Sequence, residues 1–255
     1  MTEYHEYYPL GHIQAISLLL KNAANFATDK SEQLTKVDYS KYGEFADMVF
    51  GEDFHLSVYC DAAYSHLVAS SLATFFESFF FHEFHNLRDE YEARRKEYEG
   101  RALKNSSFDR WKLISKDDFW NPKKVAYKLG KTKRDIVDGV QQLMEALEIS
   151  IPIQPEKWLL IRTLFLYRNY VIHNGFEWRK AKLREFKSKV RNLKVDECFR
   201  SATSGNETWI IYMTKEFEFE LVEFAFEIVH LFDLWFDERM NRFQHDADYL
   251  FNEDK

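Results

Sequence analysis

The sequence predicts an all-α fold: a bundle of long antiparallel helices with a small β hairpin before the last helix. Apolar residues recur at three- and four-residue spacing over several long segments, as one face of a helix requires. Only 8 glycines and 4 prolines among 255 residues disfavour a turn-rich all-β fold. Hydrophobic residues make up 45% of the chain, and its 24 phenylalanines are enough for a sizeable core.

In the N-terminal part, we expect a short helix over residues 10–27 and mixed loops and turns over residues 28–52. Residues 1–52 would thus form a helical extension to a main bundle of residues 53–255. From about residue 61 to 99 the pattern predicts one long helix, or two joined helices. Its thick apolar stripe consists of Leu67, Leu72, Phe75, Phe76, Phe79, Phe80 and Phe84.

The middle of the chain begins with a polar stretch. Residues 101–131 contain the helix-breaking pair Asn121-Pro122 and are expected to form an insertion. The next helix is expected over residues 132–149, with Thr132 as its N-cap. Another is expected over residues 155–172, because a proline suits a first helical turn and Gly175 suits a position just past the end.

The last predicted elements are a hairpin and a long helix. The hairpin lies within residues 196–213, with its turn at Ser204-Gly205-Asn206. Thr214 is expected to cap a final helix that runs to about Arg242. Two adjacent apolar stripes give this helix a wide apolar face, so it is either central to the bundle or also contacts a second protomer.

The charge of the chain is unevenly distributed. The net charge of −7 disfavours indiscriminate nucleic-acid binding, but residues 179–194 carry eight basic side chains and one acid, Glu185. The remaining chain holds 27 basic and 41 acidic residues. This basic island, residues 179–194, could guide RNA through its local field, or it could be an ordinary solvated helix face. Leu183, Phe186, Val190 and Leu193 recur at helical spacing, which would put the charges on the outer face.

Several function classes find no support in the sequence. The two cysteines, Cys60 and Cys198, lack metal or redox spacing and suggest a reducing compartment. The first residues do not resemble a signal peptide, and no stretch is long and apolar enough to span a bilayer. We therefore expect a cytoplasmic protein without membrane contact. A phosphate-cradling glycine loop and a nucleophile elbow are also missing.

One short segment combines a permanent cation with a group that titrates near neutral pH. Arg168 is followed by Asn169 and, three residues later, by His173 in the last turn of the predicted helix. Asn169 and His173 are four residues apart and share a face, and Arg168 lies about 100° away. Such groups suit chemistry on a phosphodiester, because a guanidinium binds phosphate charge and an imidazole moves a proton. Alternatively, Arg168 caps the helix or forms an ion pair, and His173 is an ordinary helix-end histidine.

The segment Arg168-Asn169-x-x-x-His173, followed by Asn174-Gly175 late in an apolar helix, resembles the Arg-x4-His motif of the HEPN superfamily. HEPN proteins are helical bundles, and many are metal-independent endoribonucleases. In that family the motifs of two protomers face each other across a dimer and form one composite site. The resemblance therefore implies a toxin–antitoxin or antiviral (abortive infection) context, with a possible antitoxin or regulatory protein as partner.

The resemblance also implies roles for the three residues. His173 would act as general base or acid, Arg168 would stabilise charge on the phosphoryl oxygens, and Asn169 would orient the phosphate or His173. A single motif supplies one histidine where both an acid and a base are useful, so we expect a homodimer. The mechanism implied requires no metal or cofactor.

Further residues are expected to contact the RNA. Tyr170 and Asn174 lie within the motif segment. The first part of the basic island would bind the substrate through Arg179, Lys180 and Lys182. The alternative function is a non-catalytic HEPN-like helical module that binds a nucleotide, RNA or protein partner.

Two acid and histidine arrangements complete the set of candidates. Glu77 lies among phenylalanines, and a buried carboxylate needs a partner, so we expect it to support Arg168. Alternatively, Glu77 faces solvent through a gap between the rings. His82 and His85 are three residues apart, whereas the zinc-protease pattern places two histidines four apart. A metal hydrolase built on this pair is the third alternative, although no clear third ligand is present.

Overall fold

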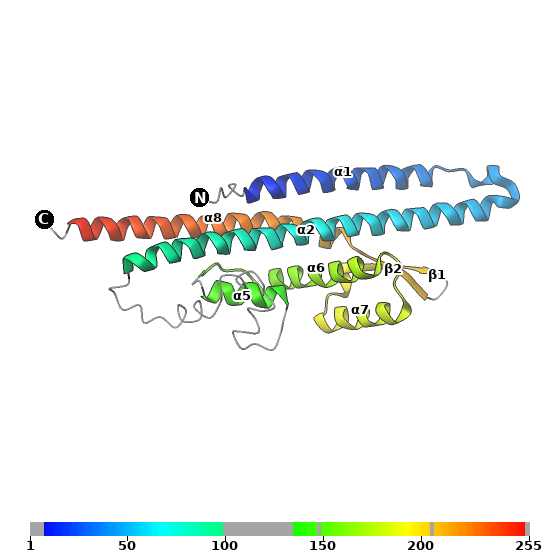
Figure 1. Cartoon of the computed structure of the whole chain (residues 1–255). Helices are drawn as coiled ribbons and strands as arrows, with labels where there is room; N and C mark the ends of the chain where they lie inside the picture. Colours follow the sequence, from blue (N-terminus) through cyan, green and yellow to red (C-terminus); the bar gives the residue numbers. More distant parts are fainter. Residues whose placement is uncertain (1–7, 99–134, 147–148, 205–206, 253–255) are drawn as a thin grey trace. The chain divides into compact units, whose positions relative to one another are not determined.

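The computed structural model describes residues 8–98, 135–146, 149–204 and 207–252, and these are mostly α-helical (Figure 1). A two-stranded antiparallel sheet precedes the last helix, as the sequence predicted. The predicted insertion at 101–131, the Thr132 cap and the turn residues Gly205 and Asn206 lie outside the described residues. Over the described part of the chain, no helix combines the length and the apolar character needed to cross a membrane.

The elements follow one another as a series of long and short helices interrupted by the hairpin. Their bounds in chain order are α1 Pro9–Thr35, η1 Tyr39–Phe45, α2 Ala46–Tyr98, α5 Ile136–Ala146, α6 Pro155–Asn174, α7 Lys180–Leu193, η3 Asp196–Cys198, β1 Phe199–Ser204, β2 Glu207–Met213 and α8 Lys215–Asn252.

The N-terminal part is more helical than the sequence predicted. Helix α1 extends to Thr35 and α2 begins at Ala46, so the loops expected over residues 28–52 are mostly helix. The boundary expected between residues 52 and 53 lies inside α2. The prediction missed the helical turns over residues 39–52 because apolar residues there, such as Phe45 and Phe50, are more than half exposed and form no buried stripe.

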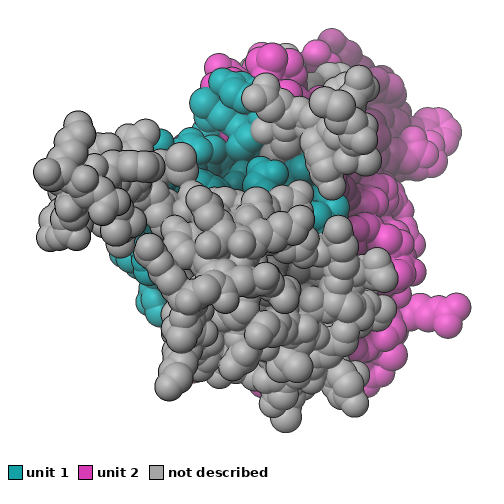
Figure 2. All heavy atoms as spheres, turned by 60° about the vertical axis from the view of Figure 1, so that its left-hand side comes forward, with its two compact units in different colours: residues 1–10, 76–162, 224–255 teal, residues 11–75, 163–223 magenta. Residues whose placement is uncertain are grey.

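The chain divides into two compact units, each described here separately (Figure 2). Unit 1 comprises residues 1–10, 76–162 and 224–255, and unit 2 comprises residues 11–75 and 163–223. Helices α1, α2, α6 and α8 contribute residues to both.

Unit 1 has an aromatic core. Phe79 and Phe80 of α2 are almost fully buried, and the Phe79 ring lies 5.0 Å from the ring of Phe232 in α8. The Phe80 ring stacks on Trp158 of α6 at 6.2 Å. The part of the expected apolar stripe that lies in this unit, Phe76, Phe79, Phe80 and Phe84, is thus a core face, and its burial stabilises the unit.

Unit 2 packs the hairpin against two helices. Phe199 of β1 pairs with Met213 of β2, and the Tyr167 hydroxyl of α6 donates a 3.1 Å hydrogen bond to the Ile211 carbonyl. On another part of the hairpin, Ala202 and Ile210 pack against Val58 and Ala62 of α2. The cap predicted for the last helix is confirmed, because the Thr214 hydroxyl accepts a 3.3 Å hydrogen bond from the Phe217 N–H.

Glu218, a buried acid at the start of α8, makes the stability of unit 2 depend on pH. Its carboxylate accepts a 3.1 Å hydrogen bond from the Ser65 hydroxyl, which in turn accepts from the Met213 N–H. Burial is the main cause that raises the pKa of Glu218 from 4.5 to about 7. The folded chain therefore binds this proton more tightly than the unfolded chain does. The contribution of Glu218 to the free energy of unfolding should thus decrease as the pH rises from 4.5 to 7.

We predict that Glu218→Gln removes this dependence, because a glutamine keeps an acceptor for Ser65 but does not titrate. The free energy of unfolding of the variant minus that of wild type should be about 2–3 kcal/mol larger at pH 8 than at pH 4.5. Urea unfolding at both pH values measures the change. Burial raises the pKa of Glu83 in unit 1 in the same direction, so only the difference between the two proteins is informative. Parallel pH profiles for the two proteins would contradict the prediction.

Candidate functional site

The Arg–His motif lies at the C-terminal end of α6, and local hydrogen bonds fix where that helix stops. Gly175 adopts a left-handed conformation with φ of +69°, and its N–H donates to the Val171 carbonyl at 2.8 Å. The Asn174 side-chain amide donates to the Tyr170 carbonyl at 2.7 Å. The predicted helix end is therefore confirmed, and His173 stands in the last turn.

The segment after the helix is anchored within unit 2. The Trp178 indole donates a 2.7 Å hydrogen bond to the Gly175 carbonyl, and the Tyr59 hydroxyl of α2 donates to the Glu177 carboxylate. The Phe176 ring packs edge-on against His66 of α2, with ring centroids 5.8 Å apart. These contacts hold the end of α6 against α2, so the motif is presented by a fixed backbone.

The motif side chains occupy one outward arc of α6. At 100° per residue, Arg168, Ile172, Asn169 and His173 follow one another over about 140°. Asn169 and His173 are exposed, and Arg168 is half-buried. The Arg168 guanidinium donates a 3.3 Å hydrogen bond to the Asn169 side-chain oxygen. A cation, an amide and an imidazole are thus available together to an approaching phosphodiester, although their catalytic role stays a prediction.

Ile172 is a surface feature that the sequence reasoning missed. This aliphatic side chain is 46% exposed and lies between Arg168 and His173 on the arc. Its signal in the sequence was only an apolar residue at a position where the helix faces outward. A single exposed apolar side chain is common on protein surfaces, and Ile172 is the apolar member of this otherwise polar arc.

The position of Tyr170 corrects one prediction. Only 7% of this residue is exposed, and its ring packs against Trp178 at 5.3 Å and Phe186 at 5.1 Å. The Lys189 ammonium lies 5.1 Å from the ring centroid, and burial raises the pKa of the hydroxyl. The expected contact between Tyr170 and RNA does not fit this burial, because apolar spacing on a helix places the ring in the core. Asn174, the other expected RNA contact, is half-buried and uses its amide to cap α6.

The basic island forms α7, and its charges face outward as predicted. Leu183, Phe186 and Val190 are buried, whereas Arg179, Lys180 and Lys182 are exposed. Their local field is weaker than the sequence suggests, because several lysines are paired within the chain. The salt bridges are Lys180 to Glu207 at 2.6 Å, Lys182 to Glu185 at 2.7 Å and Lys189 to Glu185 at 2.9 Å.

Hydrogen bonds from Lys182 and Lys189 lower the pKa of the Glu185 carboxyl to about 2. Within the described residues, no ion pair involves Arg179 or Arg191. Arg179 and Arg191 are therefore cations of the basic island that remain open to phosphate.

The acid and histidine candidates lie in the other unit. Glu77 belongs to unit 1 and Arg168 to unit 2, so their pairing stays a prediction. The His85 ring nitrogen Nδ1 lies 2.9 Å from the Phe81 carbonyl, and burial lowers the pKa of His82. Within the described ranges, no group of three or more histidine, cysteine or acidic side chains is placed to hold a metal ion.

We predict that Gly175→Ala destabilises the end of α6 by about 1–2 kcal/mol, because an alanine is strained at a positive φ. A Cβ at this position would meet no atom within 4 Å, so the cost is one of backbone conformation alone. Gly51 is a matched control inside α2 with equally open surroundings. Gly51→Ala should stabilise the protein by roughly 0.5–1 kcal/mol in the same denaturation experiment. Equal effects at both glycines would show that the left-handed turn is unimportant.

Searches against protein-family models, curated proteins and solved structures find no match to this chain. The functional assignment therefore depends on the chemistry of the side chains at the end of α6.

Proposed function

We propose that this chain is a metal-independent endoribonuclease whose catalytic residues are Arg168, Asn169 and His173. One observation carries the proposal: these side chains share an outward arc at the end of α6, next to a helix rich in cations. The resemblance to the HEPN motif supports the same assignment. A guanidinium beside an exposed imidazole supplies both phosphate binding and proton transfer.

In this mechanism the RNA 2′-hydroxyl attacks the adjacent phosphorus. The bond between phosphorus and the 2′ oxygen forms while the bond to the 5′ oxygen breaks, which leaves a 2′,3′-cyclic phosphate and a 5′-hydroxyl. His173 accepts the proton from the 2′-hydroxyl, or its protonated form gives a proton to the leaving 5′ oxygen. Arg168 stabilises the charge that develops on the phosphoryl oxygens, and Asn169 orients the phosphate.

The assembled enzyme is proposed to be a homodimer that brings two α6 ends together. Each chain supplies one motif histidine, and a second copy provides the missing acid or base. Ile172 offers the apolar contact in the middle of this surface. A toxin–antitoxin or antiviral setting, with a protein that restrains the activity, would suit such an enzyme.

The dimer is tested by Ile172→Asp, which places a charge in the proposed interface. Light scattering on the purified protein should show a shift from dimer to monomer, with loss of cleavage. Leu234→Asp is the matched control, since Leu234 is 47% exposed on α8 and outside the motif surface. A monomeric wild-type protein that still cleaves RNA would refute the composite site.

The activity is tested with purified chain and RNA of mixed sequence in EDTA. The proposal predicts cleavage in the presence of chelator and slower growth of cells that express the chain. If an intact dimer cuts no class of RNA, the non-catalytic module that binds a nucleotide, RNA or protein becomes the better account. If chelator abolishes cleavage, the metal-independent mechanism is wrong.

A further inference from the structure

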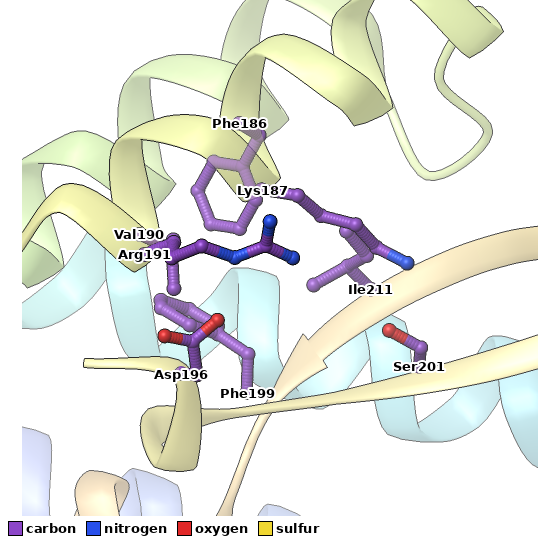
Figure 3. A pocket seen from close by; sticks show the side chains of 8 residues that line it. All are labelled: Phe186, Lys187, Val190, Arg191, Asp196, Phe199, Ser201 and Ile211. Carbon is purple, nitrogen blue, oxygen red and sulfur yellow. The ribbon is translucent and has the colours of Figure 1, made fainter. Parts of the chain in front are cut away.

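A pocket of about 240 Å³ lies between α7 and the hairpin, within unit 2 (Figure 3). None of its lining residues belongs to the Arg–His motif. No sequence pattern predicted this pocket, because its lining residues come from α7, η3 and both strands. A pocket of this size is smaller than the roughly 300–1,000 Å³ of most ligand sites and suits a single ring system.

The floor of the pocket is aromatic and rigid. Phe186 of α7 is only 1% exposed, and its ring meets the Phe199 ring of β1 edge-on at 5.0 Å. Ile211 of β2 is 4% exposed and completes the floor. Because Phe186 also packs on Tyr167 and Trp178, the floor is part of the core and is already formed without a ligand. Phe199, which is half-buried, is the ring of this floor that stays open to a flat, partly polar ligand ring.

The rim of the pocket carries two cations and one acid. Figure 3 shows the Arg191 guanidinium reaching from α7 over the opening, with the Asp196 carboxylate on the opposite wall. The Lys187 ammonium donates a 2.5 Å hydrogen bond to the Thr208 hydroxyl, which holds it at the hairpin side. Arg191 and Asp196 are both exposed and therefore accessible to a ligand.

We propose that this pocket binds one nucleotide, with its base on the aromatic floor and its phosphate against Arg191 and Lys187. The charges on the rim select the chemistry: guanidinium and ammonium groups bind phosphate, and a carboxylate accepts hydrogen bonds from a base. Asp196 can only accept, so it favours a base with an exocyclic amino group over uracil, whose ring N–H is flanked by two carbonyls.

The nucleotide can belong to an RNA strand or be free in solution. As a subsite for RNA, the pocket rests on the proposed function: its floor residue Phe186 packs against Tyr170 of the motif segment at 5.1 Å, so the pocket and the motif helix adjoin within unit 2. Stacking with few base contacts is how proteins commonly hold single strands.

The test uses 2′-O-methyl hexanucleotides of cytosine, adenine or uracil, which cannot be cut by 2′-hydroxyl attack. Binding to the wild-type chain is measured by fluorescence anisotropy at two salt concentrations, and free AMP and CMP are measured by calorimetry. We expect Arg191→Gln to weaken binding of the cytosine strand about tenfold, because it removes a charge-assisted phosphate contact. Arg184→Gln is the matched control: it makes the same charge change on α7 but lies outside the pocket, and should weaken binding less than about threefold.

Asp196→Asn tests base selection independently. The wild-type chain should bind the cytosine and adenine strands at least about fivefold more tightly than the uracil strand, and the variant should lose this preference. Free nucleotides that bind as tightly as the strands, with the same dependence on Arg191, would assign the pocket to a free nucleotide.

Equal weakening by Arg191→Gln and Arg184→Gln would overturn the proposal, since diffuse charge would then explain binding. Absence of binding to strands and free nucleotides would overturn it as well. Because these ligands resist cleavage, a failure of the nuclease assay leaves this result unaffected, and the reverse also holds.

Discussion

His173→Ala is expected to lower the rate of RNA cleavage by about 10²–10⁴-fold, the usual contribution of a general acid or base. The imidazole is exposed in the last turn of α6, so its removal leaves no cavity in the core. The folded state should therefore survive, and its melting temperature should change little. Single-turnover cleavage of a labelled RNA in EDTA, at saturating protein, measures the chemical step directly.

Controls separate this effect from a general loss of histidine or charge. His230→Ala removes another exposed histidine, on α8, and should leave the rate within about twofold. Arg168→Lys keeps the positive charge but not the two-pronged donor, so it should retain part of the activity that Arg168→Ala loses. A His173→Ala protein with the wild-type rate would remove the motif from the mechanism, whatever the other variants do.

Phe186→Ala is expected to reduce the free energy of unfolding by about 3–5 kcal/mol, the range for large aromatic side chains in protein cores. Its ring contacts Tyr167, Tyr170, Trp178 and Phe199 at centroid distances of 5.0–6.1 Å. These partners come from α6, the segment after it, and β1. One side chain thus joins α7 to the motif helix and the hairpin, and its loss leaves a cavity that the rigid surroundings fill poorly.

The matched control for this prediction is Phe219→Ala on α8, whose side chain is 65% exposed. Guanidinium unfolding should show a change of no more than about 0.5 kcal/mol for that surface variant. Similar losses at the two positions would mean that α7 does not pack on its aromatic face as described.

Local chemistry explains which parts of the fold were predictable. The ends of α6 follow from Pro155 and Gly175, and the start of α8 follows from the hydroxyl of Thr214. The hairpin follows from the short run of β-branched and aromatic residues at 209–212 and the turn signal before it. Each of these signals acts within a few residues, so the sequence alone is sufficient to recognise it.

Features that depend on distant partners were not predictable. Over residues 39–52 the helical turns bury no apolar stripe, so periodicity could not detect them. Glu207 neutralises Lys180 only because the hairpin folds back toward α7, which no count of charges in the basic island can reveal. Tyr170 was assigned to RNA from its place in the motif, but Phe186 and Trp178 enclose its ring.

The candidate site likewise has one part that follows from neighbouring residues and one part that depends on distant ones. Arg168, Asn169 and His173 lie within six residues, and helix geometry alone places them on one arc. The pocket with Arg191 and Asp196 needs a floor from α7 and both strands, so it emerges only from the assembled unit. Short motifs are therefore readable in a sequence, whereas pockets between elements require the fold.

The most direct test of the nuclease assignment is the chemistry of the ends that the protein leaves on RNA in EDTA. A substrate with one cleavable linkage is compared with the same strand carrying a 2′-deoxy sugar at that linkage. The account predicts a 2′,3′-cyclic phosphate and a 5′-hydroxyl from the first strand and no cleavage of the second. Cleavage of the deoxy strand, or a 5′-phosphate on the product, would contradict attack by the 2′-hydroxyl at the Arg168–His173 site.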